Sequence, residues 1–190
     1  MIVMRFHPSL FGIAVLAAST LDTPALAQIT PDSTLGNEAT IVTPDALIEG
    51  APADLVEGGA IRGENLFHSF SDFNVDTLQR VYFTNPAGIE TILTRITGGN
   101  ASNIDGLLGV DGLADLYLLN PNGIAFGPNA QLDIRGSFFV STAEGWELDN
   151  GEVFSALNPE APPILAVTLT PGLQYGATQQ ADVSNAGNLP

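Results

Sequence analysis

Residues 82–89 read Tyr-Phe-Thr-Asn-Pro-Ala-Gly-Ile, and residues 117–124 read Tyr-Leu-Leu-Asn-Pro-Asn-Gly-Ile. Five residues of the first stretch recur 35 positions later, namely Tyr82, Asn85, Pro86, Gly88 and Ile89. A sequence that matches itself at a period of roughly 20 to 50 residues is typical of stacked repeat architectures. Both copies combine a strand, a tight turn and a second strand, which predicts a scaffold that grows by adding rungs.

The chemistry of the two turns points to one shared geometry. Asn at the first position, Pro at the second and Gly at the fourth are the preferences of a type I β-turn. Proline presets its own φ, and the Asn side chain can bond to the main chain. Ala87 suits the third position of a type I turn, whereas a type II turn requires positive φ there. We therefore expect the Asn-Pro corners to stack at equivalent points along a common axis.

The first 27 residues have the features of an export signal. Arg5 is the only charged residue among the first 21, residues 10–18 are apolar, and Ala25-Leu26-Ala27 supplies a small-x-small cleavage pattern. The apolar run is too short to cross a bilayer as a helix, which takes about 20 residues. We therefore predict a signal peptide at residues 1–27 and an exported mature chain, beginning at Gln28, that does not span a membrane.

Composition narrows the classes of partner and chemistry. The chain has no cysteine, which excludes thiolate catalysis and cysteine zinc sites. It has no lysine and carries a net charge of −16, so nucleic acid and anionic lipid heads would be repelled. We interpret the acids as keeping a strand-rich surface soluble, and calcium binding by some carboxylates stays open as an alternative. No cofactor and no metal site are predicted.

The strand signals are short and frequent. Residues 28–60 hold one clear strand, 39–43, which Pro44 should end, and the stretch is expected to be a cap. Phe67, Phe70 and Phe73 lie three apart as in a helix, but the Ser and Asn residues among them are poor helix formers, so two short strands with a bend are expected.

Alternation at residues 131–141 is the clearest strand pattern. It predicts inward positions for Leu132, Ile134, Phe138 and Val140, and outward positions for Gln131, Asp133, Arg135, Ser137 and Ser141. The sum is an all-β chain, and either a parallel β-helix or a sandwich would fit. The 35-residue self-match favours the β-helix.

Several stretches together resemble a known family. They are Asn65-Leu-Phe-His-Ser-Phe70, Val81-Tyr-Phe-Thr-Asn-Pro86, Thr97-Gly-Gly-Asn100, Ile104-Asp-Gly-Leu-Leu-Gly-Val110, Asp115-Leu-Tyr-Leu-Leu-Asn-Pro-Asn-Gly123 and Leu132-Asp-Ile-Arg-Gly-Ser-Phe-Phe-Val-Ser-Thr142. In this order they resemble the N-terminal secretion domain of filamentous-haemagglutinin-type two-partner secretion exoproteins, the haemagglutination activity domain family, in a cyanobacterial-like form. Each stretch alone is weak, but the set is specific and covers most of residues 28–153.

The resemblance implies a right-handed parallel β-helix with an N-terminal capping region. It implies a secretion domain at residues 28–153, with residues 154–190 as the start of further rungs of a truncated passenger. It also implies that a dedicated outer-membrane transporter barrel with periplasmic domains recognises the chain in the periplasm. The protein would then be secreted as an adhesin-like exoprotein, free or at the cell surface, where a host or cell-surface ligand is a second candidate partner.

The candidate residues for recognition by the transporter are Asn120, Pro121, Asn122, Gly123, Asn85 and Pro86. The first turn has Ala87 where the second has Asn122, which weakens the case for a recognition role at residues 85–88. The alternative for both turns is a plain corner that holds a rung, and the two roles are compatible.

Two other classes of function compete with a secretion domain. A carbohydrate-active β-helix enzyme would need a pair of carboxylates at a defined separation, and the many acids single out no pair. We therefore predict that the protein is not an enzyme and has no catalytic residues. A stand-alone adhesion module is the other alternative. His68 has no evident partners for a metal site or a catalytic triad. The single Trp146 does not establish a sugar-binding site.

Overall fold

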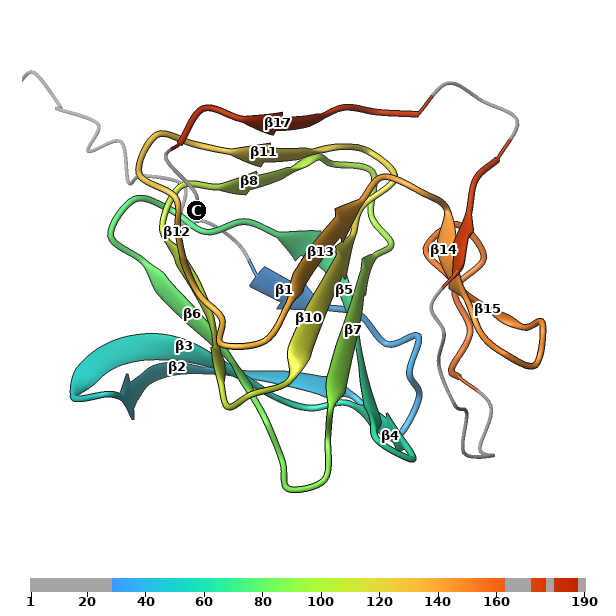
Figure 1. Cartoon of the computed structure of the whole chain (residues 1–190), viewed down its shortest axis with the longest axis horizontal. Coiled ribbons are helices and arrows are strands. Elements are labelled where there is room, and N and C mark those ends of the chain that lie inside the picture. The colour runs from blue at the N-terminus through green and yellow to red at the C-terminus, as the bar shows by residue number, and fades with distance from the viewer. Residues whose placement is uncertain (1–28, 163–171, 177–179, 188–190) are drawn as a thin grey trace, which may run out of the picture.

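The computed structural model describes residues 29–162, 172–176 and 180–187, so the predicted signal peptide lies outside the described residues. All regular elements in the described ranges are β-strands. Three sheets with parallel pairing enclose one core, and Figure 1 shows them as the three sides of a triangle. The predicted parallel β-helix is therefore confirmed, and the sandwich alternative is wrong.

We name the three sides A, B and C. Side A pairs, in this order, β5 (Asn65–Phe73), β7 (Thr91–Ile96), β10 (Asp115–Leu119) and β13 (Phe138–Ser141). Side B pairs β3 (Ala51–Gly58), β6 (Arg80–Thr84), β9 (Leu107–Asp111) and β12 (Gln131–Asp133). Side C pairs β8 (Ser102–Ile104), β11 (Ile124–Phe126) and β17 (Val183–Asn185). The chain therefore visits sides B, A and C in turn as it coils.

The register gives a rung that is shorter than the self-match suggested. Thr91 pairs with Asp115, 24 positions later, and Arg80 of β6 pairs with Leu107, 27 positions later. Tyr82 lies on side B, whereas Tyr117 lies on side A. The 35-residue match thus compares two different corners of the triangle, and the expectation of equivalent, stacked Asn-Pro corners is wrong. The same Asn-Pro sequence therefore follows an apolar strand at two different corners, after β6 and after β10.

The N-terminal region forms the predicted cap. Strand β2 (Thr40–Ile48) pairs antiparallel with β3 at the edge of side B, while β1 (Ile29–Pro31) and β4 (Ala60–Arg62) pair antiparallel with β5. Pro44 does not end β2, contrary to expectation. The register shifts between Thr43 and Ala46, where Asp45 has φ of 56°, and proline is tolerated at such an irregularity of an edge strand.

The main core fills the triangle with aliphatic and aromatic side chains, among them Phe70, Phe73, Phe83, Phe126, Leu66, Ile92 and Ile96. Strand β5 is continuous rather than two strands with a bend, and Phe67 faces outward while Phe70 faces inward. The predicted inward residues of 131–141 pack against this core as expected. Ser141 pairs with Leu119 on the outer face of side A, as its predicted outward position requires, but it is buried there, and Ala143 N–H donates to its Oγ at 3.1 Å.

Between β13 and β17 the chain leaves the coil. Strands β14 (Gly145–Glu147), β15 (Val153–Ser155) and β16 (Gly172–Gln174) form an antiparallel sheet beside side A (Figure 1). We call residues 143–162 the outer flap. A second core joins the flap to the outer face of side A, and its members are Leu35, Ala60, Phe67, Leu93, Leu119, Ala143, Trp146, Leu148, Phe154 and Ala156.

Candidate recognition site at the two Asn-Pro corners

Asn120 occupies the corner between sides A and C, and its side chain is entirely buried. The carboxamide Nδ2 donates to the Asn100 carbonyl and to Ser102 Oγ, both at 3.0 Å. The Oδ1 atom accepts the Asn122 N–H at 2.9 Å. Asn120 therefore joins its own turn to the loop that precedes β8, one rung earlier.

The rest of this corner follows the predicted pattern. Gly123 N–H donates to the Asn120 carbonyl at 3.1 Å, which closes a turn with Asn first and Gly fourth. Gly123 is buried with φ of 112°, and Pro121 is half-buried. Only Asn122 is exposed, and its Nδ2 donates to the Gly98 carbonyl at 2.7 Å. Both polar side chains of the corner are thus engaged within the domain.

Asn85 occupies the corner between sides B and A, and the turn there is displaced by one residue. Ile89 N–H donates to the Pro86 carbonyl at 3.1 Å, so Gly88, with φ of 85°, takes the third position. Positive φ at that position is the requirement of a type II turn. The prediction of one shared type I geometry is therefore wrong for the first corner. The prediction placed Ala87 at the third position, where positive φ is unfavourable, but the turn begins at Pro86 and puts Gly88 there instead.

The Asn85 side chain reaches forward along the coil. Its Oδ1 accepts the N–H groups of Leu113 and Ala114 at 2.9 and 3.1 Å, and its Nδ2 donates to the Ile89 carbonyl at 2.8 Å. Asn85 is half-buried, whereas residues 86–88 are exposed. In the folded domain, the surface that these corners offer to a partner consists of Pro86–Gly88 and Asn122.

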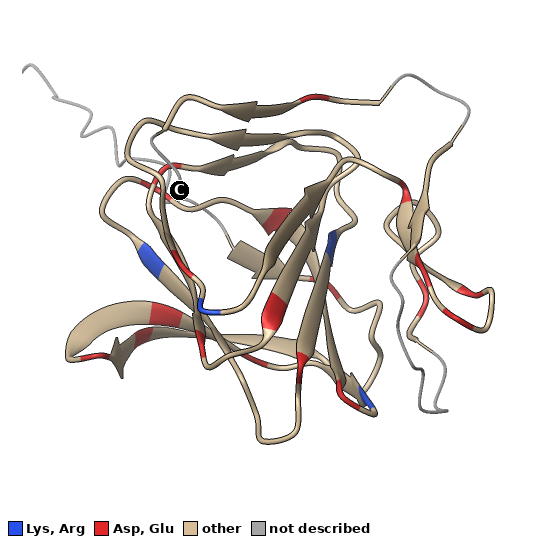
Figure 2. Cartoon of the chain, in the orientation of Figure 1, with Lys and Arg blue, Asp and Glu red and all other residues tan. Residues whose placement is uncertain are grey.

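The six candidate residues do not form one site. The structure divides them between two corners of the triangle, and none of the six side chains is titratable. Their chemistry is limited to amide hydrogen bonding and to proline packing. Figure 2 shows acidic residues spread over the rungs, the cap and the flap, with few arginines among them. Within the described ranges, no group of three or more His, Asp or Glu side chains is placed to hold a metal ion.

Sequence reasoning missed two buried arginines, Arg62 and Arg95. Burial lowers the pKa of Arg95 to about 10, although Asp32 opposes this shift, and Arg95 has no exposed surface. Hydrogen bonding to Glu38 raises the pKa of Arg62 above its usual value. Their burial could have been suspected from the sequence. The chain has only five basic residues, and each of these two arginines is next to an isoleucine within a strand.

His68 and Trp146 are packed residues. His68 faces Phe70 and Phe83, and burial lowers its pKa from 6.5 to about 3. Trp146 is 2% exposed, and its Nε1–H donates to the Thr94 carbonyl at 3.2 Å. Both side chains therefore support the two cores and not a ligand site on the surface.

Comparison with known families identifies the domain. The family model of the TPS secretion domain, where TPS stands for two-partner secretion, matches residues 27–188. This chain belongs to the TPS secretion domain family. The crystal structure of the filamentous haemagglutinin secretion domain superposes with a TM-score of 0.56 at 21% identity, covering 85% of this chain and 51% of that one. It shows the same β-helical fold.

A curated relative extends the comparison to a whole exoprotein. The heme/hemopexin-binding protein of Haemophilus influenzae is 32% identical over 108 residues, which are 56% of this chain and 10% of that protein. The chain thus spans about a tenth of the relative's length. The shared family is that of a secretion domain. No helix in the described ranges is long and apolar enough to cross a membrane.

Proposed function

We propose that this TPS secretion domain is bound by the periplasmic domains of its cognate transporter while at least part of the chain is unfolded. The domain then folds into the β-helix as it emerges outside the cell. An unfolded segment can add a strand to the sheet edge of a partner, and this mode uses main-chain hydrogen bonds. Folding outside the cell would bias transport outward without nucleotide hydrolysis.

The burial of Asn120 is the observation that carries this proposal. In the folded domain Asn120 has no exposed surface, and its Oδ1 and Nδ2 atoms already have partners within the chain. A transporter could read the Asn120 side chain directly only before this corner closes. The corner would therefore be recognised in the unfolded chain and would hold the rungs together in the folded domain.

A secretion assay tests the proposal. The exported chain is expressed with its transporter, and released protein is compared for the wild type, Asn120→Ala, Gly123→Ala and Asn122→Ala. We expect the first two variants to lower release about tenfold or more. Asn122→Ala should lower it less, because that side chain is exposed and water can replace its hydrogen bonds to Gly98 and Asn120. Normal release of both Asn120→Ala and Gly123→Ala would contradict a recognition role for this corner.

A second variant separates recognition from mere instability. Gly109→Ala places a methyl group into the Tyr82 ring on side B, whereas Asn120–Gly123 lies at the corner between sides A and C, so the variant should weaken the β-helix without touching that motif. If recognition matters, Gly109→Ala should be released better than Asn120→Ala at equal loss of stability. Equal release at equal stability would assign the corner a purely structural role.

The other functional expectations stay proposals. We propose that the domain is not catalytic and has no metal site, and that residues 154–190 lead into further passenger rungs at the cell surface. The family match continues past residue 153 to residue 188, which bears on where the secretion domain ends. Adhesion to a host or cell-surface ligand is tested by binding of the isolated mature chain to cells, and a carbohydrate-active enzyme by polysaccharide cleavage.

A further inference from the structure

Arg95 joins three separate parts of the chain on the outer face of side A. Its Nε–H donates to Ser69 Oγ of β5 at 2.9 Å, and its Nη2 donates to Thr34 Oγ1 at 2.7 Å. Its Nη1 donates to the carbonyl of Ser155 in the outer flap at 3.0 Å. One guanidinium therefore links the rungs, the segment near the N-terminus and the flap.

The flap also supplies the surface that covers this guanidinium. The Phe154 ring lies over it, with 3.9 Å between the Arg95 guanidinium carbon and the ring centroid. The edge of the same ring contacts Phe67 at a centroid distance of 4.9 Å. Without the flap, Arg95 would lose a hydrogen-bond acceptor and its aromatic cover, while Phe67 would face water.

Asp32 completes the polar network on the N-terminal side. Its carboxylate accepts hydrogen bonds from Thr34, Ser69 and Thr97, at 2.6–2.9 Å. Burial alone would raise the pKa of Asp32, but these hydrogen bonds outweigh it and lower the pKa below its usual value. The carboxylate therefore stays charged close to Arg95, and it orders the Thr34 and Ser69 hydroxyls that the guanidinium uses.

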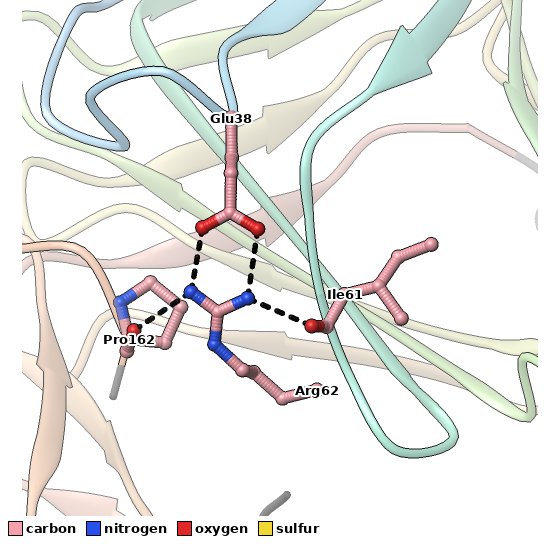
Figure 3. Close-up of polar contacts among 4 residues, drawn as sticks. All are labelled: Glu38, Ile61, Arg62 and Pro162. Atoms are coloured by element: carbon pink, nitrogen blue, oxygen red, sulfur yellow. Dashed lines mark hydrogen bonds and ion pairs between the residues drawn. The ribbon is translucent and has the colours of Figure 1, made fainter. Parts of the chain in front are cut away.

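Arg62 makes a second link between the same two segments (Figure 3). Its guanidinium forms a bidentate pair with the Glu38 carboxylate, at 2.8 and 2.6 Å. The Nη2 atom also donates to the carbonyl of Pro162, which is the last described residue before the gap, at 3.0 Å. Arg62 is 6% exposed, so this contact too is shielded from water. Bidentate pairs of this kind fix orientation as well as distance.

We infer that the outer flap is a clasp that closes the β-helix onto residues 32–38 through Arg95 and Arg62, so that rungs and flap unfold as one unit. A buried cation that lacks partners is strongly unfavourable, so the packing around Arg95 cannot be completed until Phe154 and Ser155 dock. Where the chain is exported as proposed above, folding would then finish only after residue 162 has emerged. That last consequence rests on the proposed function, but the clasp itself does not.

Urea unfolding of the purified mature chain tests the clasp, because the chain has one tryptophan and Trp146 lies in the flap. Trp146 fluorescence reports the flap, and far-UV circular dichroism reports the strands. We expect the two transitions to coincide in the wild type. In Arg95→Met the guanidinium contacts are lost, and the midpoint of the Trp146 transition should fall about 1 M urea below that of the strands.

Two further variants make the result decisive. Arg135→Met removes an exposed arginine from the corner between β12 and β13, so it matches the charge change, and its two transitions should still coincide. Phe154→Leu removes only the aromatic ring that covers the Arg95 guanidinium, and it should separate the two transitions in the same direction. It replaces Arg95→Met as the test if that variant fails to fold. Coincident transitions in Phe154→Leu, or separate transitions in the wild type or in Arg135→Met, would overturn the clasp. No transporter is present, so the outcome is independent of the proposed function.

Discussion

Asn85 and Asn120 show that one residue type in one sequence pattern can do different work at two corners. The Asn85 oxygen reaches forward to two N–H groups of the next rung, at Leu113 and Ala114. The Asn120 amide reaches back to the previous loop, at Asn100 and Ser102. Only Asn120 is fully enclosed, so the loss of its side chain leaves buried polar groups with fewer partners.

This difference predicts unequal costs for the two alanine substitutions. A buried polar group that loses its partner costs about 1–3 kcal/mol, and one near solvent costs less because water replaces the partner. Asn120→Ala should therefore lower the free energy of unfolding by about 3 kcal/mol, and Asn85→Ala by about 1 kcal/mol. Urea denaturation of the purified domain measures both, with Asn122→Ala as the exposed control. A larger loss for Asn85→Ala would contradict the burial argument.

His68 should make the domain sensitive to mild acid. The described structure buries it completely, its Nε2 has no hydrogen-bond partner, and burial lowers its pKa from 6.5 to about 3. Between these two values the unfolded chain binds a proton that the folded chain does not, so stability falls as the pH falls. At pH 5 this effect is about 2 kcal/mol relative to pH 7.5, at about 1.4 kcal/mol per pKa unit.

Unfolding free energies at pH 7.5 and pH 5.0 check this prediction, with His68→Gln as the control. The lowered pKa of Asp32 gives stability that is lost only below its usual value of 3.8, so it leaves this window almost unchanged. The variant should therefore lose most of the pH dependence between the two conditions. An equal pH dependence in His68→Gln would show that other groups cause it.

At the scale of elements, side B is held together by a column that spans three strands. Tyr82 of β6 pairs with Gly109 of β9, which pairs with Asp133 of β12. The Tyr82 ring lies across the glycine, and its hydroxyl donates to the Asp133 carboxylate at 2.5 Å. An aromatic ring that covers a glycine on the neighbouring strand also helps to fix the register.

Gly109→Ala should therefore be far more harmful than an ordinary glycine replacement. The added Cβ would overlap the Tyr82 ring, and overpacking of this kind costs about 1–3 kcal/mol. The double variant Tyr82→Ala/Gly109→Ala should cost less than the sum of the two single variants, because the clash is gone. Gly99→Ala is the matched control, since its Cβ would meet nothing within 4 Å. Additive losses, measured by urea denaturation, would exclude the column.

Corners repeat a related arrangement, with an Asn or Asp side chain above a glycine of the next rung. Asp105 Oδ1 accepts the Asn129 N–H at 2.9 Å beside Gly127, and Asp115 Oδ1 accepts the Ser137 N–H at 2.6 Å beside Gly136. Some of the acids that composition assigned to solubility thus also hold successive rungs in register. Their role depends on pairing across rungs, which no local pattern in the sequence shows.

For the whole molecule, the sequence predicted the fold class better than it predicted the rung length and the contacts between distant segments. The β-helix, the cap and the inward face of residues 131–141 could be derived from turns, alternation and family resemblance. The rung length could not, because the self-match joined Tyr82 of side B to Tyr117 of side A. The flap could not be predicted either. Ser155, whose carbonyl accepts a hydrogen bond from Arg95, lies 60 positions away in the sequence, and only the folded coil brings the two residues together.

The charge of the whole chain predicts that moderate salt stabilises the domain. A net charge of −16 makes the compact state repel itself, and screening shortens the range of this repulsion from about 30 Å at 0.01 M to about 8 Å at 0.15 M ionic strength. Salt also weakens the Glu38–Arg62 pair, but a partly exposed pair contributes about 1 kcal/mol or less. The repulsion among sixteen uncompensated negative charges should outweigh the loss of this pair, so the free energy of unfolding should rise by about 1 kcal/mol between 10 and 200 mM NaCl.

The double variant Glu49→Gln/Glu152→Gln removes two exposed acids and should flatten this rise. A fall in the free energy of unfolding with added salt would mean that attractive pairs dominate over repulsion.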